Sequence, residues 1–259
     1  CENEKSKTVY QVDQNEKVIA DSSKQRLLKI IEGGWLNEKY IDAMKRLNSP
    51  MAAIGFGFPY QQIEFDISNL NGDTLINSKS GAFSHFGDRF DPVFYRKTDE
   101  RVGMKIKMAR AQSMEILLDY LFENNDTVLV MTIWDGKDIS KDRFQRQFRK
   151  FPDTDDVSFN AMEYFANNQL LVGDWNMSGK TVSFSENGRV KNFRNFKRFS
   201  VKTFDENPES APDRIYFYND STDATYTFTI VHQRLQLYEI KLSGERFTRG
   251  NLIAELSRN

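Results

Sequence analysis

The sequence contains one cysteine, two histidines and six prolines among 259 residues. A single cysteine excludes an intrachain disulfide framework and any metal site built on several cysteines. The longest apolar run, 128–134, is much shorter than the roughly 18 residues that a membrane-spanning helix needs. No His-x-x-x-His, Cys-x-x-Cys, Gly-x-Ser-x-Gly or calcium-loop motif occurs. We therefore assign no catalytic residue, metal ligand or cofactor from the sequence.

An excess of charge of one sign is also missing, because 36 Lys and Arg balance 37 Asp and Glu to a net charge of −1. Proteins that bind nucleic acids usually carry a basic excess that meets phosphate, so we expect no nucleic-acid partner. Apolar residues, in contrast, are plentiful: 39% of the chain is hydrophobic and 21 residues are Phe. This composition supports a sizeable core and excludes disorder of the whole chain. The length suits one large domain or two ordinary ones.

The chain opens with Cys1, followed by a polar stretch to about Lys24 that is rich in Glu, Lys, Ser and Gln. An N-terminal cysteine before a polar spacer resembles a processed bacterial lipoprotein, in which several acyl chains give stable anchoring. Glu2 and Glu4 resemble the acidic export tag of Bacteroidetes surface lipoproteins. The alternative is a sequence boundary that happens to fall at a cysteine. The resemblance implies a lipidated Cys1, a polar tether over 1–24, and an extracytoplasmic location at the outer membrane or cell surface.

Two segments of the chain look alike. In each, a short helix with one apolar face runs into the motif Gly-x-Trp, at Gly33 and Trp35 and again at Gly173 and Trp175. Since the chain has only three Trp and 14 Gly, two matching motifs in matching contexts indicate an internal duplication. After the tether, we expect two domains and a connecting helix. Their boundaries are 25–156 for the first domain, 157–259 for the second and 159–169 for the helix.

Short apolar-rich runs separated by turn signals follow each motif. Asn71-Gly72 and Asn187-Gly188 each join two such runs, which is the strongest short-range signal for a hairpin. In 225–231, Tyr, Phe and Ile alternate with Thr, a period-two pattern with one apolar face. Many short strands with turns between them predict a sandwich or barrel. We predict strands at 62–69, 74–77, 93–96, 102–108, 116–122, 127–134, 140–151, 181–184, 190–193, 214–218, 225–231, 235–241 and 252–256.

Helices are expected at few other places. The segment 38–47 has helical character and ends before Ser49-Pro50, because the residue before a proline avoids the α region. The segment 159–168 is predicted to be a helix with Asp156 or Ser158 as its N-cap.

A short helix, Gly-x-Trp on the first strand and about seven hairpin-linked strands resemble the calycins, the group of lipocalins and fatty-acid-binding proteins. The second half fits best and looks like the lipocalin-like domains of Bacteroidetes lipoproteins. The resemblance implies a mostly β fold of two antiparallel calycin-like barrels, closed or half-open, each preceded by a short helix. In this group the Gly allows close backbone packing, the Trp plugs one end, and an Arg of the last strand covers the Trp. The corresponding residues are Gly33, Trp35, Gly173, Trp175 and Arg258, with Arg146 or Arg149 as the arginine over Trp35.

The sharpest basic patch is interleaved with Phe193, Phe196 and Phe199. Such a patch can form a face for anionic glycans, lipid headgroups or nucleic acid. It can equally be a solvated strand face whose Phe side chains point into the core. The candidate residues of this face are Arg189, Lys191, Arg194, Lys197 and Arg198.

Eight strands make a barrel that is either filled by side chains or holds one small ligand. We expect a non-catalytic, monomeric lipoprotein that is attached to a membrane and binds an apolar small molecule, a lipid or a glycan. The alternative is a scaffold for protein partners with filled barrels; an enzyme is the third class. The segment 173–181 resembles a phosphate loop, but five residues separate its glycines and a strand pattern follows where a helix is needed.

Overall fold

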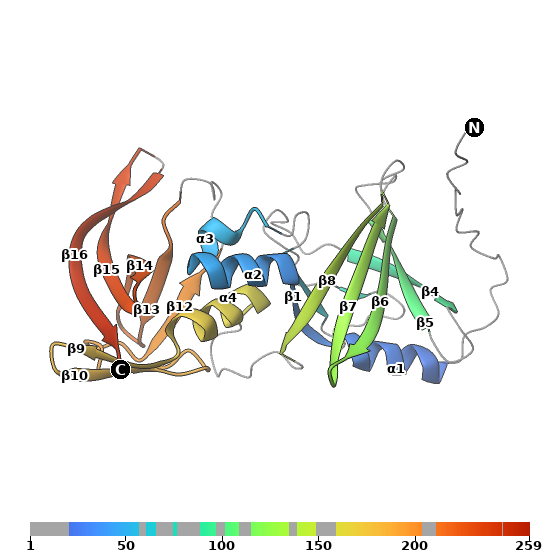
Figure 1. Ribbon diagram of the computed structural model, residues 1–259, viewed down its shortest axis with the longest axis horizontal. Helices are drawn as coiled ribbons and strands as arrows, with labels where there is room; N and C mark the ends of the chain where they lie inside the picture. Colours follow the sequence, from blue (N-terminus) through green and yellow to red (C-terminus); the bar gives the residue numbers. More distant parts are fainter. Residues whose placement is uncertain are drawn as a thin grey trace, which may run out of the picture.

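The structure is a computed structural model that describes residues 21–56, 61–65, 75–76, 89–96, 102–108, 115–134, 139–148, 159–203, 211–244 and 246–259. The described chain is mostly β, with two antiparallel sheets of eight strands each and a few short helices (Figure 1). One sheet forms a half-barrel and the other a nearly closed barrel. The predicted fold class is confirmed.

The first sheet has the strand order β2-β1-β8-β7-β6-β5-β4-β3. Its strands are β1 (Gly33–Asn37), β2 (Gln62–Phe65), β3 (Leu75–Ile76), β4 (Arg89–Arg96), β5 (Val102–Met108), β6 (Glu115–Glu123), β7 (Asp126–Trp134) and β8 (Ile139–Phe148). The predicted strand at 140–151 is therefore present as β8, and its last residues, 149–151, lie outside the described part of the chain. The predictions at 66–69, 74 and 77 also lie outside it.

The second sheet has the strand order β11-β10-β9-β16-β15-β14-β13-β12. Its strands are β9 (Gly173–Met177), β10 (Lys180–Phe184), β11 (Val190–Lys191), β12 (Arg198–Lys202), β13 (Arg214–Tyr218), β14 (Asp223–Val231), β15 (Arg234–Ser243) and β16 (Arg246–Arg258). An isolated bridge between Arg189 and Arg198 links the two edge strands and narrows the remaining opening.

Both sheets follow the same circular order when their strands are counted from the first strand of each half. Consecutive strands pair, and the first strand pairs with the last, β1 with β8 and β9 with β16. The first sheet opens between its second and third strands, whereas the second opens between its third and fourth. This shared topology is what a duplicated up-and-down barrel produces.

A short helix precedes the first strand of each sheet. Helix α1 (Asp21–Ile31) begins within the segment predicted as a tether, because its apolar positions Leu27, Leu28 and Ile31 pack into the first core. Helix α4 (Ala161–Ala166) continues into a π-helical turn, η2 (Asn167–Leu171). Its N-cap is Asn160, which forms a capping box with Glu163. The predicted caps, Asp156 and Ser158, lie outside the described residues, and the observed N-cap is Asn160.

An insertion of two helices separates β1 from β2. Helix α2 (Glu38–Leu47) has the predicted bounds, with Asn37 at its N-cap and Asn48 in the left-handed region at its C-cap. Ser49 then caps the short helix α3 (Pro50–Ala53), which the sequence did not predict. Proline at the first helical position does not interrupt α3, because the missing amide has no partner there in any helix.

The insertion packs on the second half of the chain. Tyr40, Ile41 and Met44 of α2 belong to the same apolar cluster as Trp175, Phe217 and the other interior residues of the second barrel. Two hydrogen bonds reinforce the junction: the amide of Met51 donates to Asp213 at 3.0 Å and that of Met162 donates to Gln62 at 3.1 Å. The second core is therefore completed by residues of the first half (Figure 1).

Several strand predictions need correction. β4 begins at Arg89 instead of 93, because the strand continues through Pro92, which pairs with Ile106. β12 was not predicted, although Phe199 and Val201 point inward, because basic residues flank them. β11 ends at Lys191 instead of 193, because Asn192 takes a left-handed conformation. β16 begins at Arg246 instead of 252, because a hairpin with β15 continues beyond the barrel.

None of the described helices is long and apolar enough to cross a bilayer.

Candidate functional site

The two tryptophans occupy equivalent positions. Trp35 and Trp175 are both fully buried, and each indole nitrogen donates to the carbonyl four residues earlier. These bonds join Trp35 to Ile31 at 2.6 Å and Trp175 to Leu171 at 2.8 Å. Each indole therefore fixes the end of the preceding helix to the first strand of its sheet.

An arginine of the last strand covers each indole. Arg146 lies with its guanidinium 4.5 Å from the ring centroid of Trp35, and Arg258 lies 5.2 Å from that of Trp175. The pairs are also direct neighbours in the sheet registers, Trp35 opposite Arg146 and Trp175 opposite Arg258. Of the two candidates for Trp35, Arg146 makes the contact, whereas Arg149 lies outside the described residues.

The glycines of these motifs adopt a backbone conformation with positive φ. Gly33 has φ of 116° and Gly173 has φ of 125°, a region that side chains of L residues rarely adopt. A Cβ on Gly173 would lie 3.8 Å from Arg258, which is an ordinary contact distance. The close backbone packing expected at Gly173 is thus not the reason for glycine there; the positive φ is.

The interior of the second barrel is filled by aromatic side chains. Phe193 and Phe217 contact each other in a tilted arrangement with ring centroids 4.5 Å apart, and Phe184 meets Phe199 edge to face at 4.9 Å. Phe193, Phe199 and Phe217 are fully buried. Among the described residues, the interior of this barrel is packed with side chains.

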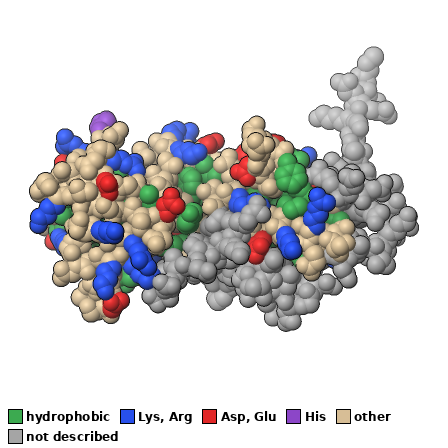
Figure 2. Space-filling model, turned by 90° about the horizontal axis from the view of Figure 1, so that it is seen from below, with side chains coloured by type: hydrophobic (Ala, Val, Ile, Leu, Met, Phe, Trp, Pro, Cys, Tyr) green, Lys and Arg blue, Asp and Glu red, His purple; other side chains and the backbone are tan. Residues whose placement is uncertain are grey.

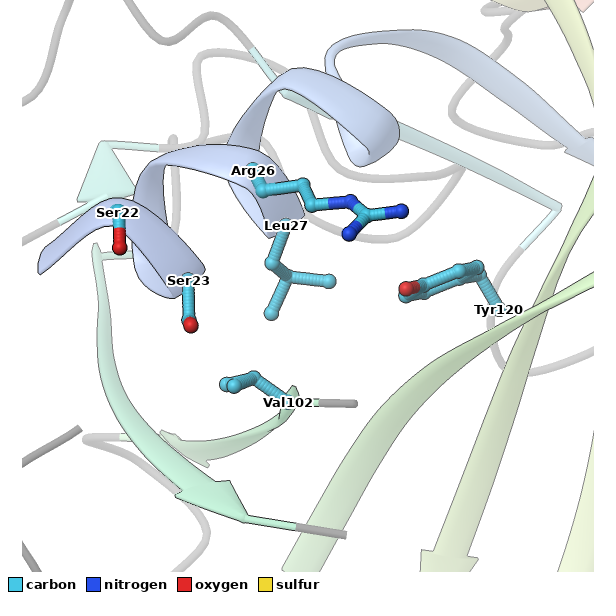
Figure 3. Close-up of a pocket in the computed structure, with 6 residues that line it drawn as sticks. All are labelled: Ser22, Ser23, Arg26, Leu27, Val102 and Tyr120. Carbon is cyan, nitrogen blue, oxygen red and sulfur yellow. The ribbon is translucent and has the colours of Figure 1, made fainter. Parts of the chain in front are cut away.

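A cavity of about 250 Å³ lies in the first half, between α1 and the sheet. The apolar part of its lining consists of Leu27 from α1, Val102 from β5 and Tyr120 from β6; the polar part consists of Ser22, Ser23 and Arg26 from α1 (Figure 3). The figure shows the Arg26 side chain and the Tyr120 ring on facing sides of the space. The lining is therefore mixed: α1 contributes Leu27 together with a cation and two hydroxyls, and the sheet contributes Val102 and Tyr120.

The sequence alone did not single out this cavity. Arg26, Leu27 and Tyr120 are distant in sequence or unremarkable in type, and only the packing of α1 against β5 and β6 brings them together. A usable signal was the apolar face of 27–31, which shows that this helix must cover a core.

The predicted basic face is largely engaged in contacts within the second barrel. Arg194 donates to the Tyr226 hydroxyl at 2.7 Å and lies over the Phe193 ring. Lys197 forms an ion pair with Asp220 at 2.8 Å. Arg189 and Lys191 are exposed, and Arg198 stands opposite Arg189 in the isolated bridge. Phe193 and Phe199 are fully buried, which is what the alternative of a solvated strand face expects of them.

Other charged groups form structural pairs. Arg143 pairs with Glu38 at 2.9 Å and with Glu123 at 2.6 Å, and its hydrogen bond lowers the pKa of Glu123. His232 lies in the β14–β15 turn, and His85 lies outside the described residues. No cluster of three His, Cys, Asp or Glu side chains suited to a metal occurs among the residues that the structure describes.

Comparison of the chain with protein-family models, curated proteins and solved structures finds no match.

Proposed function

We propose that the protein is a non-catalytic binding protein whose first half-barrel holds an apolar small molecule or a lipid. The observation that carries this proposal is the cavity between α1 and the sheet, where Leu27, Val102 and Tyr120 supply apolar surface and Arg26 supplies a cation. Its volume of about 250 Å³ lies just below the roughly 300–1,000 Å³ typical of ligand pockets, which favours a small ligand or a single chain of a larger one.

The division of the two halves supports the proposal. The second barrel is packed with aromatic rings, whereas the first keeps a space beside its core. Within this proposal the protein stays extracytoplasmic and is attached to a membrane through Cys1, as the lipoprotein resemblance implies. Replacing Cys1 by Ser should then release the protein from membranes of its host, and unchanged membrane association would contradict the anchor.

The binding test uses the environment-sensitive fluorophore 1-anilinonaphthalene-8-sulfonate as probe, with two variants that fill the cavity from opposite sides. Val102→Phe fills it from β5 and Ser23→Phe from α1. We expect the probe to bind the native chain and to bind each variant at least tenfold more weakly. Val231→Phe, at a 52% exposed position on β14, is the control and should bind normally. Circular dichroism verifies that each variant is folded.

The packed interior of the second barrel favours one alternative, a scaffold that presents surfaces to protein partners. The same probe titration distinguishes the two functions. Equal probe binding by all folded variants, or no binding at all, would remove the small-molecule function and leave the scaffold.

A further inference from the structure

The apolar inner face of β6 continues past the rim of the half-barrel. Side chains two residues apart on a strand share a face. Along β6, Ile116 and Leu118 are 1% exposed and Tyr120 is 6% exposed, but Phe122 is 67% exposed. The ring of Phe122 meets that of Tyr120 edge to face at 5.4 Å. An apolar track therefore leads from the cavity, which Tyr120 lines, to an aromatic ring in solvent.

The hairpin holds this ring in place. Asn124 and Asn125 form the two-residue β6–β7 turn with positive φ values of 51° and 65°, the tight turn that suits antiparallel strands. The acidic neighbour Glu123 is paired with Arg143. The tip thus presents Phe122 on a rigid element that also carries two exposed carboxylates, Glu123, which shares Arg143 with Glu38, and Asp126.

Cationic side chains accompany Phe122 at this end of the half-barrel. Helix α1 and the β6–β7 turn both lie at the lower end in Figure 1, and Arg26 and Lys29 of α1 are exposed. Figure 2 views the molecule from this side and shows hydrophobic side chains at the surface next to Lys and Arg. A small apolar group bordered by cations matches the membrane–water interface, where aromatic rings insert and basic residues meet headgroups.

We propose that Phe122, with Arg26 and Lys29, docks on the surface of an anionic lipid bilayer, so that the cavity opens toward the membrane. The cavity's role as a ligand site rests on the function proposed above, whereas docking itself does not. A single exposed ring is too small for a stable protein interface, which buries about 1,200 Å² or more. A bilayer needs no complementary surface and accepts the ring alone.

The test measures co-sedimentation with phosphatidylethanolamine–phosphatidylglycerol vesicles. Every sample carries Cys1→Ser, which removes any acyl anchor from the measurement. We expect the parent to bind and Phe122→Ser to lower its vesicle partition about tenfold, from the loss of apolar burial. Arg26→Gln should weaken binding further at low salt. Matched controls are Ile139→Ser and Leu242→Ser, at 57% and 68% exposed positions elsewhere, and these should bind like the parent.

Failure to bind by the folded parent, or equal loss in the Ile139 and Leu242 controls, would overturn the proposal. The probe titration without vesicles tests ligand binding in the cavity separately from membrane docking. Phe122→Ser should keep normal probe binding in solution. A chain that binds vesicles through Phe122 but takes up no probe would support docking and remove only the proposed ligand site.

Discussion

At the residue scale, the tryptophan–arginine pairs are the most informative contacts in the molecule. Arg258 covers Trp175 and donates to the carbonyl of Val172 at 2.7 Å, and Arg146 covers Trp35 and donates to the carbonyl of Ile30. Each arginine therefore joins the last strand to the segment just before the first strand. A guanidinium can do both at once because its planar face stacks while its edge donates.

The first prediction concerns these arginines. Arg258→Met keeps the apolar stem but removes the cation and its donors, and we expect the free energy of unfolding to fall by about 1–3 kcal/mol. Arg146→Met should act similarly. Arg234→Met is the control, since Arg234 forms an exposed pair with Glu255 and should cost less than about 1 kcal/mol. Urea denaturation measures all three; equal losses would show that stacking contributes nothing.

Asp213 is a partly buried carboxyl at the junction of the halves. Burial raises its pKa above the ordinary value of 3.8, although hydrogen bonds from Met51 and Ser49 and the charge of Arg249 act in the opposite direction. Because the folded pKa exceeds the unfolded one, the folded protein holds this proton more tightly. Its stabilising contribution is complete below pH 3.8 and is lost as pH rises through the folded pKa.

The second prediction follows from that sign. Asp213→Asn keeps an oxygen that can accept from Met51 but cannot ionise, so the advantage of the native chain over the variant should shrink as pH rises from about 3 to about 7. Asp220→Asn is the opposite control, because Lys197 lowers the pKa of Asp220. There the native advantage should grow over the same range. Chemical denaturation at several pH values measures both, and parallel curves would contradict the assignment.

These residues differ in how far sequence predicts them. Gly-x-Trp is a local motif, and Arg258 lies near the end of the last strand. Both could therefore be identified from the sequence without knowledge of the strand pairing. The selection of Arg146 depends on the sheet register. Asp213 could not be identified, because its hydrogen-bond partner, the amide of Met51, lies 162 positions away in the sequence.

At the element scale, strands bounded by clear turn signals were predicted closely. β5 and β13 have the predicted bounds, β7 begins one residue early, and β6 is one residue longer at each end. β12 was not predicted, because it has only two inward-pointing apolar residues and basic residues flank them. β16 was predicted too short, because its first residues lie beyond the barrel and lack an apolar face. Helix α3 was missed since four residues carry too little periodicity.

The third prediction concerns a turn that the sequence did identify. Gly188 has φ of 72°, and a Cβ there would lie 2.4 Å from the Phe159 ring, so Gly188→Ala combines backbone strain with overpacking. We expect a loss of about 2–5 kcal/mol. Gly179 has φ of 82° with nothing within 4 Å, so Gly179→Ala isolates the backbone cost of about 1–2 kcal/mol. Equal losses in thermal denaturation would contradict the Phe159 contact.

At the scale of the whole molecule, the duplication is not a pair of independent units. The insertion between β1 and β2 lies in the core of the second barrel, and β2 supplies side chains that accept from the first amides of α4. Nothing in the sequence of the insertion specifies which barrel it covers, because an amphipathic helix packs on any apolar surface of suitable shape. The topology of each half was predictable, but their joint core was not.

The fourth prediction tests that joint core. The fragment 157–259 contains every strand of the second barrel but lacks Tyr40, Ile41, Met44 and the rest of the insertion. We expect it to expose apolar surface and to lose most of its stability relative to the whole chain, because large buried side chains contribute about 1.5–3 kcal/mol each. Urea denaturation of the fragment and the whole chain gives the comparison. A fragment with the stability of the whole chain would show that the halves are independent.

The central proposal is that the cavity of the first half holds a ligand, whereas the second half is filled by side chains. Its most direct test is a crystal structure of the protein with a brominated apolar probe, located by anomalous scattering. The account predicts one bromine position per chain, beside Leu27, Val102 and Tyr120. Bromine inside the second barrel, or a saturated crystal with none beside these three residues, would contradict it.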